Sequence, residues 1–124
     1  MSTYADKFCG IVNSTFVGCT LCLCKEVGIL QVLIDAPGPL TSDEIAAEKD
    51  LKERYVRELL ATLATAEVIQ VSTNEAGSLV YHLEEEEKNV FKTNILAFLG
   101  FVNPLTKVYD KIKSCVSRTG PLGK

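Results

Sequence analysis

The chain has 124 residues, which is enough for one domain with a sizeable core and too few for two ordinary domains. Its content of 47% hydrophobic and 23% charged residues is typical of a folded globular protein and excludes a disordered chain. The formal net charge of −3 argues against a general polyanion binder, because nucleic-acid-binding domains usually carry a basic excess.

Residues 4–26 predict one long helix that is apolar on most sides. Phe8, Val12, Phe16, Cys19 and Leu23 mark one face, and Val17, Leu21 and Cys24 mark another. Such a helix must be covered on most sides. One flank can pack on its own domain, while the other needs a second copy of the chain or a following domain; a central helix inside the monomer is the alternative. The residues expected at a dimer interface are Phe8, Val12, Phe16, Val17, Leu21 and Leu23.

The same segment is not expected to enter a membrane. Glycines and polar residues interrupt its apolar run, which falls short of the ~20 predominantly apolar residues of a membrane span. The residues before it lack the basic region of a signal peptide. Five cysteines, an odd number without a convincing secretory signal, indicate reduced thiols and a cytoplasmic protein.

Three of the cysteines lie close together, but their spacing does not predict a metal site. On a helix, Cys19, Cys22 and Cys24 point in different directions, and no His is nearby. We therefore expect them to be small buried hydrophobic residues and expect no metal in this chain.

Residues 29–36 predict a second, buried helix, which Gly28 precedes and Pro37, Gly38 and Pro39 end.

A helix-turn-helix follows within residues 39–71. Its first helix covers about 42–48, and Thr41 with Glu44 three residues later is the pattern of a capping box. Leu40 and Ile45 have the spacing of a hydrophobic staple. Asp50 tolerates the left-handed turn, and the second helix covers about 53–66.

The next two segments predict a hairpin, which completes a winged helix. Strands are expected at 69–72 and 79–83, with a turn at 74–77. Strand alternation places Tyr81 and Leu83 on one face and the chain's one histidine, His82, on the solvent side. The predicted fold class is mainly α with a small β-hairpin, a winged helix-turn-helix with extra N- and C-terminal helices.

Three helical segments are expected after the hairpin, at 84–91, at 93–102 and from Asn103 to about 117. The four glutamates Glu84–Glu87 suit the positive end of the first helix dipole. Asn103 is the expected cap of the last helix, with Pro104 at its first position. Residues 1–119 are therefore assigned to the winged-helix dimerisation domain with its flanking helices, and 120–124 to a linker stub.

The helix-turn-helix region resembles the N-terminal winged-helix domain of class I S-adenosylmethionine-dependent methyltransferases, the branch named for its likeness to transcriptional regulators. The resemblance covers about residues 15–83. Leu51, the run Arg54-Tyr55-Val56-Arg57-Glu58 and the pair Val68-Ile69 carry it. The chain departs from the family pattern at Asp50 and Glu67, where Gly is usual, and at Lys52, where a small capping residue is common.

This resemblance implies a dimerisation and substrate-lid module, in which the N-terminal helices interlock between subunits and the last helices border the substrate cleft. It implies S-adenosylmethionine as the cofactor of the full-length enzyme and a catalytic domain as a partner, either within a homodimer or as a separate chain. The eight glycines are too scattered for an acidic-x-Gly-x-Gly cofactor loop, so this chain alone is expected to bind no cofactor. Whether the chain is a fragment or free-standing stays open.

The alternative function is that of a DNA-binding regulator, whose second helix would lie in the major groove. Its base-facing candidates are Lys52, Arg54 and Arg57. Glu53 and Glu58 lie four residues from the two arginines and neutralise them. The wing, residues 72–83, contains no Lys or Arg to hold phosphates, so nucleic-acid binding is not favoured.

Overall fold

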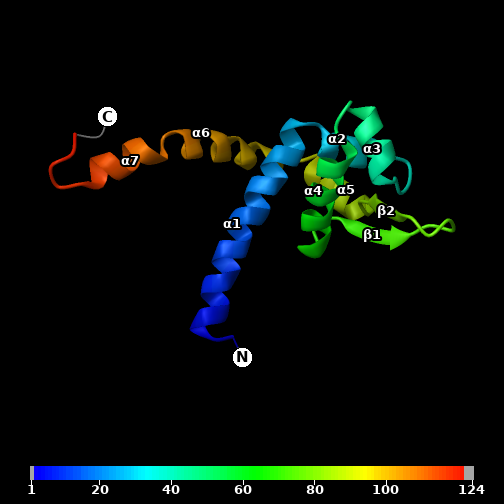
Figure 1. The fold of residues 1–124 in the computed structure, drawn as a ribbon, viewed down its shortest axis with the longest axis horizontal. Coiled ribbons are helices and arrows are strands. Elements are labelled where there is room, and N and C mark those ends of the chain that lie inside the picture. The colour runs from blue at the N-terminus through cyan, green and yellow to red at the C-terminus, as the bar shows by residue number, and fades with distance from the viewer. Residues whose placement is uncertain (1, 122–124) are drawn as a thin grey trace.

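The computed structural model describes residues 2–121 and shows a winged-helix body from which two helical segments project (Figure 1). The elements in chain order are α1 (Tyr4–Glu26), α2 (Ile29–Asp35), α3 (Ser42–Glu48), α4 (Glu53–Thr65), β1 (Gln70–Thr73), β2 (Leu79–His82), α5 (Glu85–Phe91), the 3₁₀ helix η1 (Asn94–Phe101), α6 (Val102–Lys107) and α7 (Tyr109–Val116). The predicted fold class, mainly helical with one antiparallel hairpin, is confirmed. The expected linker at 120–124 lies mostly outside the described residues.

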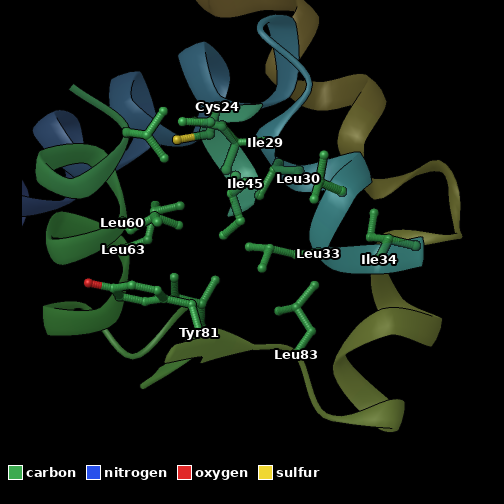
Figure 2. Close-up of a cluster of buried hydrophobic side chains, with 14 residues drawn as sticks. Cys24, Ile29, Leu30, Leu33, Ile34, Ile45, Leu60, Leu63, Tyr81 and Leu83 are labelled. Atoms are coloured by element: carbon green, nitrogen blue, oxygen red, sulfur yellow. The ribbon is translucent and has the colours of Figure 1, made fainter. Parts of the chain in front are cut away.

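The hydrophobic core lies where α2, α3 and α4 meet the wing (Figure 2). Its most deeply buried large side chains include Leu33 from α2, Ile45 from α3, and Leu60 and Leu63 from α4. Tyr81 and Leu83 close it from the hairpin side. Truncating one such aliphatic side chain to Ala typically costs about 2–5 kcal/mol, so this cluster accounts for a large part of the domain's stability.

Helix α3 begins at the predicted cap. The Thr41 hydroxyl accepts a hydrogen bond from the Glu44 backbone N–H at 3.1 Å, and the Thr41 N–H donates to Glu44 Oε1 at 3.0 Å. The two bonds close the capping box. Leu40 and Ile45, the predicted staple pair, both pack in the core.

Helices α3 and α4 end in the same way, with a residue in the left-handed backbone conformation. These residues are Asp50 at φ 54° and Glu67 at φ 62°. After each, the next N–H reaches five residues back: Leu51 N–H donates to the Ala46 carbonyl at 2.8 Å, and Val68 N–H to the Leu63 carbonyl at 2.9 Å. This is the Schellman motif, in which Gly usually occupies the left-handed position.

The wing is a short antiparallel hairpin whose register runs from Gln70 opposite His82 to Thr73 opposite Leu79. Gly77 takes a positive φ of 84° in its turn, and the Ser78 N–H donates to the Asn74 side chain at 2.9 Å. Leu40 pairs with Tyr81 through two backbone hydrogen bonds, so the segment before α3 extends the sheet by one bridge.

The C-terminal segments differ from the prediction in three ways. Residues 94–101 form a 3₁₀ helix instead of an α-helix. Asn103 lies inside α6 and does not cap it, which places Pro104 at the third helical position. The helix expected to run unbroken to 117 is interrupted at Val108, between α6 and α7. The apolar period continues across this break, so periodicity alone could not show it.

Helix α1 begins with a capping box that was not predicted, in which Thr3 and Asp6 exchange hydrogen bonds of 3.1 and 3.0 Å. Its N-terminal half extends away from the body (Figure 1). An 18-residue window of α1 has a mean Kyte–Doolittle hydropathy of 1.4, and 11% of it is buried. By length and composition alone α1 is long and apolar enough to cross a membrane, but the core helix of a soluble protein and an N-terminal signal sequence meet the same criterion, so the expectation that it does not enter a membrane stays a prediction.

Candidate protein-interaction surface

Large apolar side chains stand exposed along one side of α1. The exposed fractions are 58% for Phe8, 40% for Val12, 67% for Phe16 and 44% for Leu23. At about 100° of rotation per residue, these four and the exposed Cys19 lie within a sector of about 80°. We call these five residues the α1 stripe. Its own domain leaves this stripe uncovered, and contiguous apolar surface of this kind marks an interaction site.

The other two predicted interface residues lie on the opposite side of α1, toward their own domain. Leu21 packs against the core cluster. Val17 is half-buried and lines a groove between α1 and α4. A charge at Leu21 would therefore disturb the body itself, and the stripe residues are the better positions at which to test an interface.

Two grooves flank the contact between α1 and α4. One, of about 840 Å³, has small residues on both walls, among them Gly10, Gly18 and Ala61. The other, of about 500 Å³, is mostly apolar and is lined by Leu23, Val27, Leu51, Tyr55 and Leu59 together with neighbouring polar groups. We call the second one the Tyr55 groove. Because Leu23 also belongs to the α1 stripe, the stripe leads directly into this groove.

Helix α4 contributes a part of this surface that was not predicted from the sequence. Tyr55 is exposed over 60% of its area and stands beside the groove. Its spacing of four residues from Leu59 places both on one side of α4, and this was the available signal. Ile11, three residues after Phe8, extends the exposed surface of α1 on one flank and was also missed.

The C-terminal segment lies against the other flank of α1. The Lys25 ammonium donates to the Leu96 carbonyl at 3.1 Å, and the Cys22 thiol donates to the Leu99 carbonyl at 3.4 Å. Phe98 and Phe101 of η1 remain largely exposed. The C-terminal half of α1 is thus held between α4 and η1, while residues 4–16 are all exposed and the N-terminal half extends away from the body (Figure 1).

Helix α4 carries the candidate DNA-contacting residues on its exposed side, where they are partly neutralised. Arg54 Nε lies 3.8 Å from Glu58, and Arg57 Nε lies 3.9 Å from Glu53, which are the two predicted pairs. Glu53 also accepts a 2.6 Å hydrogen bond from Ser42. Lys52 stands over the Tyr55 ring, with its ammonium 5.9 Å from the ring centroid.

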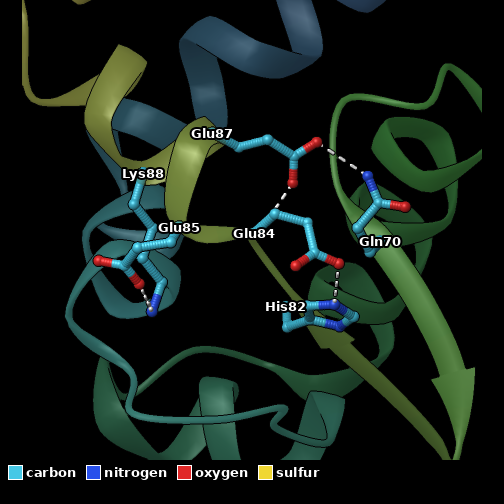
Figure 3. A network of polar contacts seen from close by, with 6 residues as sticks. All are labelled: Gln70, His82, Glu84, Glu85, Glu87 and Lys88. Atoms are coloured by element: carbon cyan, nitrogen blue, oxygen red, sulfur yellow. Dashed lines mark hydrogen bonds and ion pairs between the residues drawn. The ribbon is translucent and has the colours of Figure 1, made fainter.

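A polar network ties the wing to α5 (Figure 3). Gln70 donates to Glu87 at 2.8 Å, and the other oxygen of Glu87 accepts the Glu84 backbone N–H at 2.7 Å, which caps α5. His82 Nε2 lies 3.1 Å from Glu84. The prediction that His82 faces solvent is only partly right, because its side chain is 26% exposed and its Nδ1 atom is buried without a hydrogen-bond partner.

The cysteines divide into two kinds. Cys22 and Cys24 are buried, as expected, whereas Cys9, Cys19 and Cys115 are exposed, contrary to the expectation for Cys19. Burial raises the pKa of the Cys22 thiol and raises that of Cys24 to about 11. Among residues 2–121, no three His, Cys, Asp or Glu side chains are grouped as metal ligands would be.

Comparison with known proteins places residues 15–93 in a family described as Rv2258c-like winged helix-turn-helix domains. A solved structure of human N-acetylserotonin methyltransferase in complex with SAM is similar in fold, with a TM-score of 0.62 and 19% sequence identity. The match covers 90% of this chain and 35% of that chain. A likeness at this identity concerns the fold alone. No curated protein matches.

Proposed function

This chain belongs to the family of Rv2258c-like winged helix-turn-helix domains, and we propose that it is the subunit-pairing and substrate-lid module of an S-adenosylmethionine-dependent methyltransferase. Its fold similarity to human N-acetylserotonin methyltransferase supports the link to methyl transfer. The matched portion is 35% of that enzyme, so cofactor and substrate binding are proposed for a catalytic part outside these residues.

The exposed α1 stripe is the observation that carries the pairing role. Fully burying one large aliphatic or aromatic side chain contributes about 1.5–3 kcal/mol. Leaving Phe8, Phe16 and Leu23 in water is correspondingly costly, and a twofold pairing covers the same surface on each copy. The partner of this stripe is a second copy of the chain.

The lid role is proposed for η1. Its side chains Ile95, Phe98 and Phe101 are exposed, although the segment is anchored to α1 by the hydrogen bonds of Cys22 and Lys25. An anchored segment with exposed aromatic rings is suited to forming one wall of an apolar cleft, whose other wall a catalytic domain would supply.

Sedimentation equilibrium tests the pairing. The unmodified chain is expected to be a dimer at tens of micromolar. Phe16→Asp should convert it to a monomer without loss of helical circular dichroism, because this side chain makes little contact within its own chain. Leu79→Asp is the matched control: Leu79 is similarly exposed but lies on the wing, so this variant should remain a dimer.

A monomeric unmodified chain at these concentrations would contradict the pairing role. Restoration of a stable complex by an added methyltransferase catalytic domain would then identify that domain, and not a second copy, as what covers α1.

A further inference from the structure

We propose that the C-terminal segment of this chain, residues 102–118, binds the surface of a membrane that contains anionic lipids, with its apolar side chains inserted among the headgroups. We call these residues the C-terminal arm. They comprise α6, α7 and the residues that join and follow them. The arm lies along the surface and does not cross the bilayer. This binding is separate from the pairing through α1, which sedimentation tests by itself.

The arm extends away from the body, and its side chains are uncovered. Residues 104–119 are all exposed, and α7 lies far from α2, α3 and α4 in Figure 1. The side chains of Leu105, Tyr109 and Val116 are exposed over 58%, 67% and 79% of their area. Within residues 2–121, the body therefore gives these apolar side chains little cover.

The apolar side chains of α7 share one side of the helix. At about 100° of rotation per residue, Tyr109, Ile112 and Val116 fall within a sector of about 60°. Lys113 borders this sector, and Lys111 lies farther round the helix. A helix with an apolar side that includes an aromatic ring, and with lysines on the remainder, has the pattern of a segment that lies in a membrane interface.

The charge of the arm is opposite to that of the rest of the chain. The arm has one acidic residue, Asp110, and four basic ones, which are Lys107, Lys111, Lys113 and Arg118. Its net charge is thus +3 in a chain whose total is −3, so the other residues together carry −6. None of the four basic side chains forms an ion pair with a described residue. A surface of anionic lipids would attract the arm and repel the body.

The arm combines two attractions that are weak when each acts alone. A single acyl chain gives a membrane affinity of only about 10⁴ M⁻¹, and stable attachment requires a second signal, such as a basic patch. In the arm, Tyr109 and Ile112 supply apolar contact, and Lys111 and Lys113 supply charge on the same helix. We therefore expect reversible binding that requires anionic lipid and weakens as the salt concentration rises.

The break in the arm favours a lipid surface over the groove of an acidic protein. Grooves that accept an amphipathic helix contact residues at i, i+3, i+4 and i+7 along one continuous helix. Here the helix is interrupted at Val108, which leaves α6 and α7 with six and eight residues. A lipid surface accepts short helices separately. A nucleic acid would neutralise the lysines but leave the apolar side chains in water.

Co-sedimentation of the full chain with vesicles tests the binding. One set of vesicles consists of phosphatidylcholine alone, and the other also contains phosphatidylserine. The bound fraction should be larger with phosphatidylserine and should fall at about 1 M salt, where the screening length is about 3 Å.

Two pairs of lysine substitutions test the electrostatic part. Lys111→Gln with Lys113→Gln should weaken binding roughly 25-fold, because each basic group near an anionic surface contributes about fivefold. Lys49→Gln with Lys92→Gln is the matched control. It changes the net charge equally, at exposed residues outside the arm, and should bind as the unmodified chain does.

A single tryptophan tests the insertion, because the chain contains none. Tyr109→Trp places an indole on the apolar side of α7, and its emission should shift to the blue when phosphatidylserine vesicles are added, since the ring leaves water. Leu79→Trp is the control, because Leu79 is similarly exposed but lies on the wing, and its emission should not shift. Ile112→Asp should abolish vesicle binding and leave the helical circular dichroism of the free chain unchanged, because Ile112 is exposed.

A chain that does not bind phosphatidylserine vesicles, or that binds phosphatidylcholine alone equally well, overturns the proposal. Binding that persists in Ile112→Asp without an emission shift from Tyr109→Trp overturns it too. The contact would then be made by another apolar segment, such as α1, or by charge attraction of the kind that an acidic protein also exerts. Neither result changes the expected outcome of the sedimentation test for pairing.

Discussion

At the scale of single residues, Glu67 stands where the backbone favours glycine. It occupies the left-handed position of the α4 Schellman motif at φ 62°, and its side chain is exposed. A left-handed residue with a Cβ costs roughly 1–2 kcal/mol, and glycine avoids this cost at a smaller loss of chain entropy. Glu67→Gly should therefore raise the free energy of unfolding by about 0.5–1 kcal/mol, measured by urea denaturation.

Ala61→Gly is the control for this substitution. It introduces the same residue into the interior of α4, at an exposed position with right-handed backbone, and should lower stability by about 1 kcal/mol. If Glu67→Gly also lowers stability, the carboxylate makes a contribution in solution that outweighs the backbone cost. Asp50→Gly should gain less, because Asp tolerates the left-handed region better than Glu.

At the scale of elements, α4 has the place of a recognition helix and the charge pattern of an ordinary surface helix. Its arginines face glutamates at 3.8 and 3.9 Å, and the wing strands and their turn carry no Lys or Arg. Binding to a duplex at about 0.15 M salt should therefore be weak and without sequence preference, since specific binders reach roughly 10⁻⁸ M or tighter. A mobility-shift titration measures this affinity.

Glu53→Gln with Glu58→Gln is the informative variant, because it frees Arg57 and Arg54 without changing their positions. Its affinity should rise with a steeper dependence on salt, as more phosphate contacts become possible. Nanomolar binding by the unmodified chain would contradict the prediction.

The elements that local chemistry defines were predictable from the sequence, and those that depend on what packs beside them were not. Thr41 and Glu44 specify their capping box within four residues, and Glu53 and Arg57 specify their ion pair by spacing alone. By contrast, α1 is apolar on several sides, so its periodicity could not assign Leu21 to the core and Phe16 to solvent.

The same reasoning explains the errors near the C-terminus. The 3₁₀ geometry of η1 and the break at Val108 leave the order of apolar residues unchanged, so no pattern marks them. The Tyr55 groove was missed because it exists only once α1 and α4 lie together, and their sequences are thirty residues or so apart.

At the scale of the whole molecule, the buried Cys24 thiol makes the free energy of unfolding fall with rising pH in the alkaline range. Burial raises its pKa to about 11, whereas the unfolded chain loses this proton near the ordinary value of 9. The contribution is therefore complete below about pH 9 and is lost as pH rises toward 11, on the order of 2 kcal/mol in all. Urea denaturation across this range measures the loss.

Burial also raises the pKa of Tyr81, so part of the alkaline loss has a second source. Cys24→Ala should lower stability at neutral pH by removing a buried side chain and should flatten the decline above pH 9 without abolishing it. An unchanged decline in this variant would mean that Cys24 titrates in the folded state as it does in the unfolded state.

Because α1 projects from the body, the lifetime of each molecule in the cell is expected to depend on the concentration of the protein. In a solitary copy the first four turns have neighbours on few sides, so they open easily and present an apolar segment to proteases and chaperones. Under the proposed pairing a second copy shields that segment, and mass action makes this shielding stronger as the concentration rises. Cells would then clear scattered single copies quickly and retain assembled ones, so turnover itself would favour completed assemblies.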